Sequence, residues 1–321
     1  MTISKFPLSI ICLFFLVIAC SKDDVVEDTA IACTGDNETS TTNIGCSFTP
    51  TEENRYTEEV VNGVRTMTSN GVPVHEYGLR AQLTLAPVGG NYRVAATPTL
   101  TDTPTSILRE NNRPQFFYGI SLHGILLAPA PAEPFIFENP QTGEYNWDWV
   151  IEPTMLQGQG TIDMPRVSLD CASAHQGPQG YHYHGNMFVY AEYLIAGISD
   201  NSTVPTEPVQ MGWAADGFPI LYRYGPDGAG GIQLLQSSYQ LKEGVRPGDG
   251  ITAPCDTYSG RYTNDWEYVA GLGDLDECNG IERELTIRTV EGTKTFPYFY
   301  VVTDNFPQIG RCLMGTPSDS F

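Results

Sequence analysis

Positively charged side chains are scarce in this sequence. Lys and Arg together number 17 against 38 Asp and Glu, so the 321-residue chain carries a formal net charge of −21. Such an excess of carboxylates disfavours binding to nucleic acid and electrostatic attachment to anionic lipid. Because the acidic residues are spread along the chain, solubility is the simplest explanation for them. No nucleic-acid partner is therefore expected.

The motifs of several common enzyme classes are also missing. The sequence contains no G-x-S-x-G nucleophile elbow, no P-loop and no G-x-G-x-x-G dinucleotide turn. It has no C-x-x-C spacing either, which disfavours a zinc site made of cysteines. If the chain is an enzyme, metal-activated water or a redox-active copper is the better-supported route. The sequence does not decide whether it is an enzyme.

An apolar run near the N-terminus is too short to span a membrane. Lys5 precedes the run Leu8–Ile18, which falls short of the roughly 20 apolar residues of a transmembrane helix but is typical of a signal peptide. The run ends in Val-Ile-Ala19-Cys20, which resembles the lipobox of bacterial lipoproteins. The resemblance implies cleavage of residues 1–19 and attachment of lipid, including palmitate, to Cys20. An ordinary secretory signal with a chance cysteine is the alternative.

The residues after the lipobox suggest where the chain resides. Ser21-Lys22-Asp23-Asp24 resembles the surface-export signal of Bacteroidetes lipoproteins. This implies an outer-membrane lipoprotein that faces the cell surface, and a periplasm-facing lipoprotein is the alternative. Residues 20–55 are rich in Asp, Glu, Thr and Asn and poor in large apolar groups, so we predict a lipidated acidic tether. The lipid anchor would be the contact with the membrane.

Cysteine content agrees with export. Cys12 belongs to the predicted signal peptide, and Cys20 would be lipidated. An even number of remaining cysteines in an oxidising compartment indicates up to three disulfides. Their pairing is open, and Cys33 with Cys46 is the simplest prediction because both lie in one polar segment. The disulfide candidates are Cys33, Cys46, Cys171, Cys255, Cys278 and Cys312.

Short β-rich runs punctuated by Gly and Pro begin near residue 56. The 32 Gly and 23 Pro of the chain make long helices improbable. We therefore predict that residues 56–321 form a single compact, disulfide-containing domain of mainly β (β-rich α+β) class with short helices. The best helix candidate is Asn186–Ala196. Strands are predicted at Arg80–Leu85, Tyr92–Ala96, Phe116–Leu127, Pro219–Tyr224, Glu284–Thr289 and Phe296–Val302, with a hairpin turn at Glu291-Gly292 between the last two.

Three of the five histidines fall within ten residues. On a strand, His182 and His184 would share one face, roughly 6.5–7 Å apart along the backbone. Tyr181 and Tyr183 would then share the opposite face, where core packing is their expected role. A turn at Gly177-Pro-Gln-Gly180 would fold His175 back toward the pair.

Three imidazoles make a plausible first shell for a transition metal. Neutral imidazole is a borderline donor that suits copper, zinc, nickel or iron, and copper and zinc are the first candidates. The sequence thus predicts a metal site at His175, His182 and His184, with Asp170 or His75 in support as a further ligand or an orienting partner. The alternative is that the histidines are structural and bind no metal.

The segment Tyr181-His182-Tyr183-His184 resembles the YHYH domain, a family named for this tetrapeptide and without a settled biochemical function. The resemblance covers roughly residues 60–315. His123 departs from the family pattern, in which Asn is expected, and is therefore the least favoured histidine. Further segments that carry the resemblance are Ser69–Pro73 with His75, Leu169-Asp170 with His175, Gly212–Ala214, Asp216–Ile220, Asp274–Gly280, and Tyr298–Thr303 with Cys312.

Two other interpretations remain open. The oxygen-rich turn Asp274–Gly280 could be a calcium site, but it does not match the EF-hand spacing. A simple capped turn is therefore the favoured interpretation. Within it, Asp276 and Glu277 are candidate general bases. Trp147 and Trp149 instead suggest a platform for stacking the sugar rings of a glycan. A glycan or an extracellular protein is the expected partner in that case. Convergence of the histidines would favour metal, whereas exposed tryptophans on one face would favour glycan binding.

Overall fold

The predicted mainly β fold is confirmed by a computed structural model of the chain. The described residues are 44–79, 84–130, 132–136, 144–152, 154, 169–200 and 202–321. All of them belong to one unit of dense contacts, Cys33–Phe321. The predicted signal peptide, Cys20, Cys33 and most of the strand predicted at Arg80–Leu85 lie outside the described residues.

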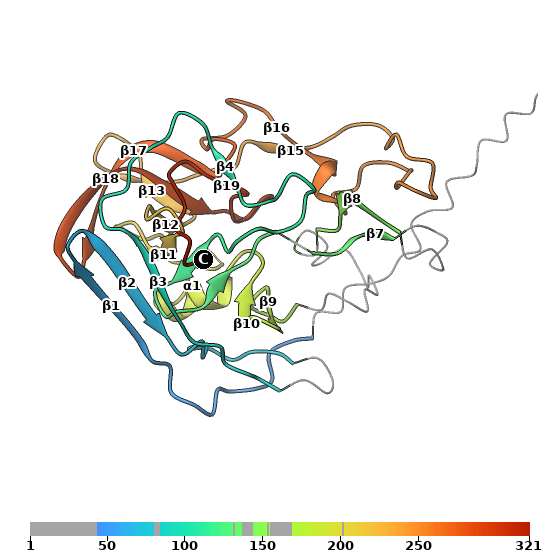
Figure 1. Cartoon of the computed structure of the whole chain (residues 1–321). Coiled ribbons are helices and arrows are strands. Elements are labelled where there is room, and N and C mark those ends of the chain that lie inside the picture. The colour runs from blue at the N-terminus through green and yellow to red at the C-terminus, as the bar shows by residue number, and fades with distance from the viewer. Residues whose placement is uncertain are drawn as a thin grey trace, which may run out of the picture. The chain divides into compact units, whose positions relative to one another are not determined.

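The largest sheet has eight strands, and β10, which carries His182, lies next to the edge strand β9 (Figure 1). The β12–β18 and β6–β10 pairs are parallel, and the other neighbours are antiparallel. The spatial order is β17 (Gly280–Thr289), β18 (Gly292–Val302), β12 (Pro219–Tyr222), β11 (Gln210–Ala214), β5 (Gly119–Ser121), β6 (Leu126–Leu127), β10 (Gly180–Tyr183) and β9 (Ala174–Gly177).

Smaller sheets surround this one. β1 (Tyr56–Val61), β2 (Val64–Ser69) and β3 (Gly90–Ala95) form an antiparallel sheet. In the described residues, no helix is both long and apolar enough to cross a membrane. The remaining elements are the pairs β4 (Thr105–Ser106) with β19 (Cys312–Leu313), β7 (Pro134–Ile136) with β8 (Tyr145–Val150), β13 (Tyr224–Pro226) with β14 (Ile232–Leu234), and β15 (Tyr239–Leu241) with β16 (Trp266–Tyr268), together with helix α1 (Phe188–Leu194) and the 3-10 helix η1 (Thr263–Asp265).

Strand β18 shows that the large sheet is covered on both faces. Its residues Tyr298 and Tyr300 belong to one buried cluster, and Phe299 and Val301 belong to another. This division follows from the alternation of side chains along a strand. The first cluster includes residues of α1, and the second includes residues of β2 and β3. The helix and the three-stranded sheet therefore pack against opposite faces of the large sheet.

Several predicted elements are confirmed in a modified form. The hairpin of β17 and β18 is present, and α1 is a shorter version of the predicted helix. The continuous strand predicted at Phe116–Leu127 is wrong, because the chain turns at Gly124 between β5 and β6. Gly124 has a φ of +82°, and a Cβ there would lie 2.1 Å from the Ser69 Oγ. Only glycine fits this turn without strain.

The disulfides correct one predicted pairing. Cys46 is bonded to Cys171, 125 residues further along, so the Cys33–Cys46 pairing is wrong. A second disulfide joins Cys278 to Cys312, and Cys255 is also disulfide-bonded. Within the tether predicted at residues 20–55, Cys46 is covalently tied to the domain and the Ile44 N–H donates to the Leu169 carbonyl at 3.1 Å. Distance in sequence is a weak guide to pairing when the fold brings remote loops together.

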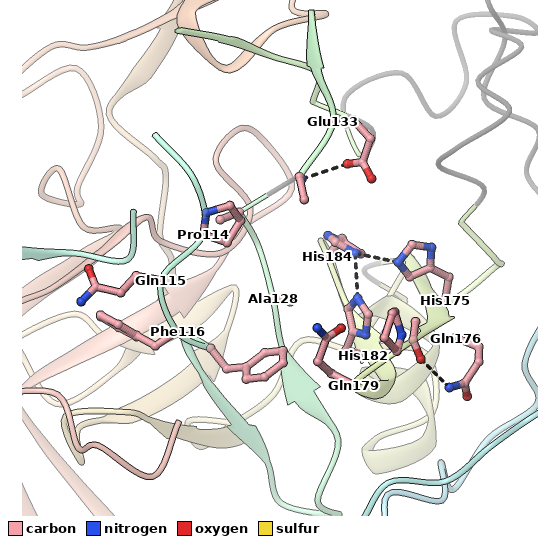
Figure 2. Close-up of a pocket in the computed structure, with 15 residues that line it drawn as sticks. Pro114, Gln115, Phe116, Ala128, Glu133, His175, Gln176, Gln179, His182 and His184 are labelled. Atoms are coloured by element: carbon pink, nitrogen blue, oxygen red, sulfur yellow. Dashed lines mark hydrogen bonds between the residues drawn. The ribbon is translucent and has the colours of Figure 1, made fainter. Parts of the chain in front are cut away.

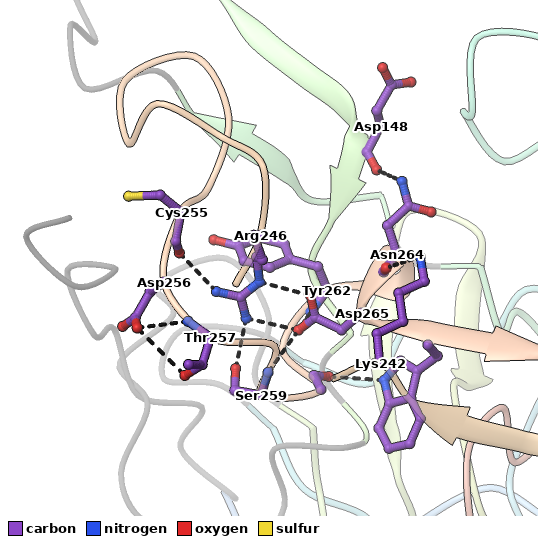
Figure 3. A network of polar contacts seen from close by, with 12 residues as sticks. Asp148, Lys242, Arg246, Cys255, Asp256, Thr257, Ser259, Tyr262, Asn264 and Asp265 are labelled. Carbon is purple, nitrogen blue, oxygen red and sulfur yellow. Dashed lines mark hydrogen bonds and ion pairs between the residues drawn. The ribbon is translucent and has the colours of Figure 1, made fainter. Parts of the chain in front are cut away.

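A buried ion pair organises the loops that precede β16 (Figure 3). Arg246 donates from Nε and Nη2 to the two carboxylate oxygens of Asp265, each at 2.8 Å. It also donates to the Cys255 carbonyl at 3.1 Å and to the Ser259 hydroxyl at 2.8 Å. Such a two-pronged Arg–carboxylate contact fixes geometry as well as charge. This network serves the fold and lies apart from the histidines.

Candidate metal centre

A tight hairpin brings the three histidines together. β9 and β10 pair in antiparallel register, with His175 directly opposite His182. Gly180 begins β10 with a φ of +96°, which favours glycine and lets the chain reverse after Pro178. We call β9, β10 and the following His184 the histidine hairpin. The predicted folding back of His175 toward the pair is confirmed.

The imidazole nitrogens of the histidine hairpin point at one another (Figure 2). The Nε2 atom of His184 lies 3.1 Å from the Nε2 of His182 and 3.1 Å from the Nε2 of His175. One ligand atom from each residue lies within 4.8 Å of the other two, and this is the only such group of His, Cys, Asp or Glu found in the described residues. Convergence on a single point is the geometry that a shared cation requires.

The hydrogen bond of His182 directs one nitrogen lone pair into this point. The Nδ1 of His182 lies 2.9 Å from the Gly180 carbonyl, which can only accept, so Nδ1 carries the proton and Nε2 a lone pair. The Nδ1 of His184 is buried, with no hydrogen-bond partner in the described part of the chain. His184 can donate one proton from Nε2, yet two imidazole nitrogens face it. A cation bound by three lone pairs would remove this mismatch.

Burial favours the neutral form of the imidazoles. It lowers the pKa of His182 below its ordinary value, and the hydrogen bond to the Gly180 backbone acts in the opposite direction. The pKa of His184 is held well below its ordinary value. Burial is the largest cause, and the positive charges of His182, His175 and Arg311 add to it by repulsion. Neutral imidazole is the form that binds metal, so protons compete little at neutral pH.

The histidines line a pocket of about 460 Å³ (Figure 2). This volume falls within the range of small-molecule sites. A ligand in the pocket would therefore meet any ion bound by the imidazoles. The described lining residues are Pro114, Gln115, Phe116, Phe117, Ala128, Ala130, Ala132, Glu133, His175, Gln176, Gly177, Pro178, Gln179, His182 and His184.

The two tyrosines of the tetrapeptide occupy the opposite face of β10, as predicted. Tyr181 and Tyr183 are 3% and 0% exposed and belong to the core cluster that contains α1. The Tyr183 hydroxyl lies 2.6 Å from the His75 Nε2. In the tetrapeptide, the two tyrosines therefore pack in the core and the two histidines face the pocket.

The structure does not bring His75 or Asp170 to the histidine cluster. The Nδ1 of His75 lies 2.6 Å from the Glu76 carbonyl, and its Nε2 faces Tyr183. Both oxygens of Asp170 accept hydrogen bonds, at 2.6–3.2 Å, from three backbone N–H groups and from the Tyr181 hydroxyl. Asp170 therefore fixes the loop that leads into β9. Neither residue is positioned as a supporting ligand.

The acidic turn Asp274–Gly280 is a capped turn and not a cation cluster within the described residues. The Oδ1 of Asp276 accepts from the Cys278 and Gly280 N–H groups, each at 2.9 Å, and its Oδ2 accepts from the Tyr298 hydroxyl at 2.7 Å. Neither Asp276 nor Glu277 is among the described residues that line the pocket. Their proposed role as general bases has no support from the geometry.

The tryptophan platform predicted for glycans is absent from the described strand β8. Trp149 is 9% exposed and packs edge-on against Tyr262. Trp147 is half-buried beneath the guanidinium of Arg113, whose Cζ lies 4.6 Å from the ring centre. Trp149 therefore serves packing, and Arg113 covers one face of Trp147. By the criterion set from the sequence, convergent histidines and buried tryptophan favour the metal interpretation.

Two pocket residues were not foreseen from the sequence. The Phe117 ring lies 6.4 Å from the ring of His182, centre to centre. Glu133 reaches the pocket from the segment just before β7. Both come from parts of the chain more than 40 residues from the hairpin, and neither stands in a recognisable motif. Only the fold could reveal them.

The fold and the three converging imidazoles on the pocket wall together define the class: a mainly β protein with a candidate metal centre. The chain belongs to the YHYH protein family, whose model matches residues 91–315. The matched span contains the whole histidine hairpin and all eight strands of the large sheet. No curated protein and no solved structure matches the chain significantly.

Proposed function

We propose that this chain is a YHYH-family protein that binds one divalent transition metal ion, copper or zinc, through His175, His182 and His184. The convergence of the three Nε2 atoms is the observation that carries the proposal. Two nitrogens bound tetrahedrally to zinc at 2.0–2.1 Å lie roughly 3.3 Å apart. The 3.1 Å separations in the hairpin differ from this value by only a few tenths of an ångström.

Donor type supports copper or zinc over calcium. Calcium takes oxygen ligands, whereas imidazole nitrogen suits copper and zinc. Three protein ligands would leave a coordination position that faces the pocket, as in catalytic rather than structural zinc sites. Water held there would be acidified by the metal and could serve as a nucleophile.

Metal analysis tests this proposal. Protein expressed from residue 21, which retains the whole unit Cys33–Phe321, is loaded with copper or zinc, desalted and analysed for metal content. We expect about one ion per chain in the wild type and none in a His182→Ala/His184→Ala variant. His123→Ala is the matched control, because His123 contacts Tyr190 outside the cluster and should retain the metal. Equally low metal in wild type and double variant, with the fold intact, would reject the proposal.

We propose further that the chain is anchored by lipid on Cys20 and faces the outside of the outer membrane. The lipobox and the Lys22-Asp23-Asp24 segment support this location, and the disulfides suit an oxidising compartment. Labelled palmitate should enter the wild-type chain and not a Cys20→Ala variant. Protease added to intact cells should digest a surface-facing protein, and protection of the chain would instead indicate the periplasmic face.

A further inference from the structure

Phe117 contributes aromatic surface to the pocket beside the histidines. It belongs to the described lining of the pocket, and its ring centre lies 6.4 Å from the ring centre of His182. The side chain is half-buried, and it also packs against the buried cluster that contains Phe299. The ring is therefore anchored in the core and still accessible from the pocket. A group bound to a metal ion on the histidine hairpin would lie close to it.

Backbone pairing fixes Phe117 relative to the histidines. The next residue, Tyr118, donates its N–H to the Leu127 carbonyl at 2.9 Å, and Ala128 donates its N–H to the Tyr183 carbonyl at 2.8 Å. These bonds join the segment before β5, the end of β6 and the end of β10, which are neighbouring strands of the large sheet. One sheet therefore carries both the ring and the imidazoles. A preformed wall of this kind lowers the entropic cost of binding a ligand.

Further apolar groups line the same pocket. Pro114, Phe116, Ala128 and Pro178 belong to its described lining. Proline and phenylalanine side chains have few rotatable bonds, so they lose little conformational entropy when a ligand packs against them. Contact between these groups and a hydrocarbon is favourable, because apolar surface on both sides leaves water. The walls around the histidine hairpin therefore suit an apolar part of a ligand.

We propose that the ligand of this site carries an apolar ring next to the oxygen or nitrogen group that binds the metal. The metal-binding group coordinates the ion on the histidine hairpin, and the ring packs against Phe117. This inference rests on the proposed metal function. It goes beyond that function by naming the class of ligand and by assigning Phe117 as the residue that selects it.

Two hydroxamates test the preference for a ring. Acetohydroxamate and benzohydroxamate bind zinc through the same group, and only benzohydroxamate carries a ring. In calorimetry of the zinc-loaded wild type, benzohydroxamate should bind about tenfold more tightly, as expected when part of a ring is buried against apolar groups. Phe117→Ala should reduce this ratio to about twofold, because the largest apolar contact is lost. Phe117→Leu, which keeps more of the contact with the core, should give an intermediate ratio.

The affinity for acetohydroxamate separates contact with the ligand from a structural role of Phe117. If Phe117 served only to orient His182, its replacement would weaken zinc binding and the binding of both probes alike. Contact with the ring of the ligand instead weakens benzohydroxamate alone. Phe48→Ala is the matched control, since Phe48 is 45% exposed and outside the described lining of the pocket. It should retain the tenfold ratio.

Three results would overturn the inference and leave metal binding intact. They are equal affinities for the two probes in the zinc-loaded wild type, an unchanged ratio in the Phe117 variants, and an equal loss of affinity for both probes. The wild-type comparison and Phe117→Leu remain decisive if Phe117→Ala does not fold. Metal analysis before each titration identifies failure of the metal proposal, in which the wild type holds no zinc and both proposals fall.

Discussion

The histidine hairpin and the acidic turn Asp274–Gly280 are both dense in metal-binding side chains, yet they differ in what already occupies their donor atoms. In the turn, the carboxylate of Asp276 accepts two backbone N–H groups and one tyrosine hydroxyl. In the hairpin, the imidazole nitrogens face one another, and Nδ1 of His184 has no hydrogen-bond partner in the described part of the chain. Availability of donors, more than their number, distinguishes a candidate site from a structural turn.

Zinc should stabilise the folded domain only by binding to the histidine hairpin. At a free zinc concentration 100 times the dissociation constant, we expect a gain of about 2.7 kcal/mol in the free energy of unfolding, because zinc binds the folded state. Urea unfolding with and without zinc measures this gain, and a chelator should remove it. The His182→Ala/His184→Ala variant should show no gain. A zinc effect in that variant would place the binding site elsewhere.

The acidic turn should matter for stability and not for metal. Asp276→Ala leaves the Cys278 and Gly280 N–H groups and the Tyr298 hydroxyl without their acceptor, so we expect a loss of about 2–4 kcal/mol. Asp274→Ala is a milder control, because Asp274 accepts the Gln236 N–H at an exposed position. Both variants should keep one zinc per chain. Loss of zinc in Asp276→Ala, with the fold intact, would contradict the comparison.

His75, which lies outside the histidine hairpin, should make the free energy of unfolding depend on pH. Burial lowers the pKa of His75 in the folded state below its ordinary value near 6.5. The contribution of His75 to stability is therefore complete at pH values above 6.5. It is lost as the pH falls through the folded-state pKa, because the unfolded chain then binds the proton more readily. The free energy of unfolding should fall by up to about 1.4 kcal/mol per pH unit in that window from His75. Burial raises the pKa of Asp170, which works in the opposite direction. Urea unfolding of wild type and His75→Gln at several pH values should show a shallower fall in the variant.

The smallest expected effect concerns the tyrosine face of β10. Tyr183→Phe removes the hydroxyl that lies 2.6 Å from the His75 Nε2 and should cost about 1 kcal/mol of unfolding free energy. Zinc content and affinity should remain as in the wild type, because the hydroxyl lies on the opposite face of the strand from the metal ligands. A tenfold weaker zinc affinity would show that the two faces are coupled.

Local features of the fold and the site could be predicted from the sequence, whereas long-range ones could not. Alternation along a strand and a glycine-flanked turn suffice to bring His175 to His182 and His184. The role of Asp170 depends on which N–H groups surround it, and these come partly from Gly78, 92 residues away. The turn at Gly124 lies within an apolar run, and the close approach of Ser69 that requires glycine there is visible only in the folded chain. Phe117 and Glu133 enter the pocket only through the complete topology.

The Cys46–Cys171 disulfide gives the molecule a defined mechanical linkage. It joins the backbone at Cys46 to Cys171, which is next to Asp170. Asp170 in turn holds the loop that leads into β9. Part of any tension on the backbone at Cys46 is therefore transmitted to the loop beside the histidines.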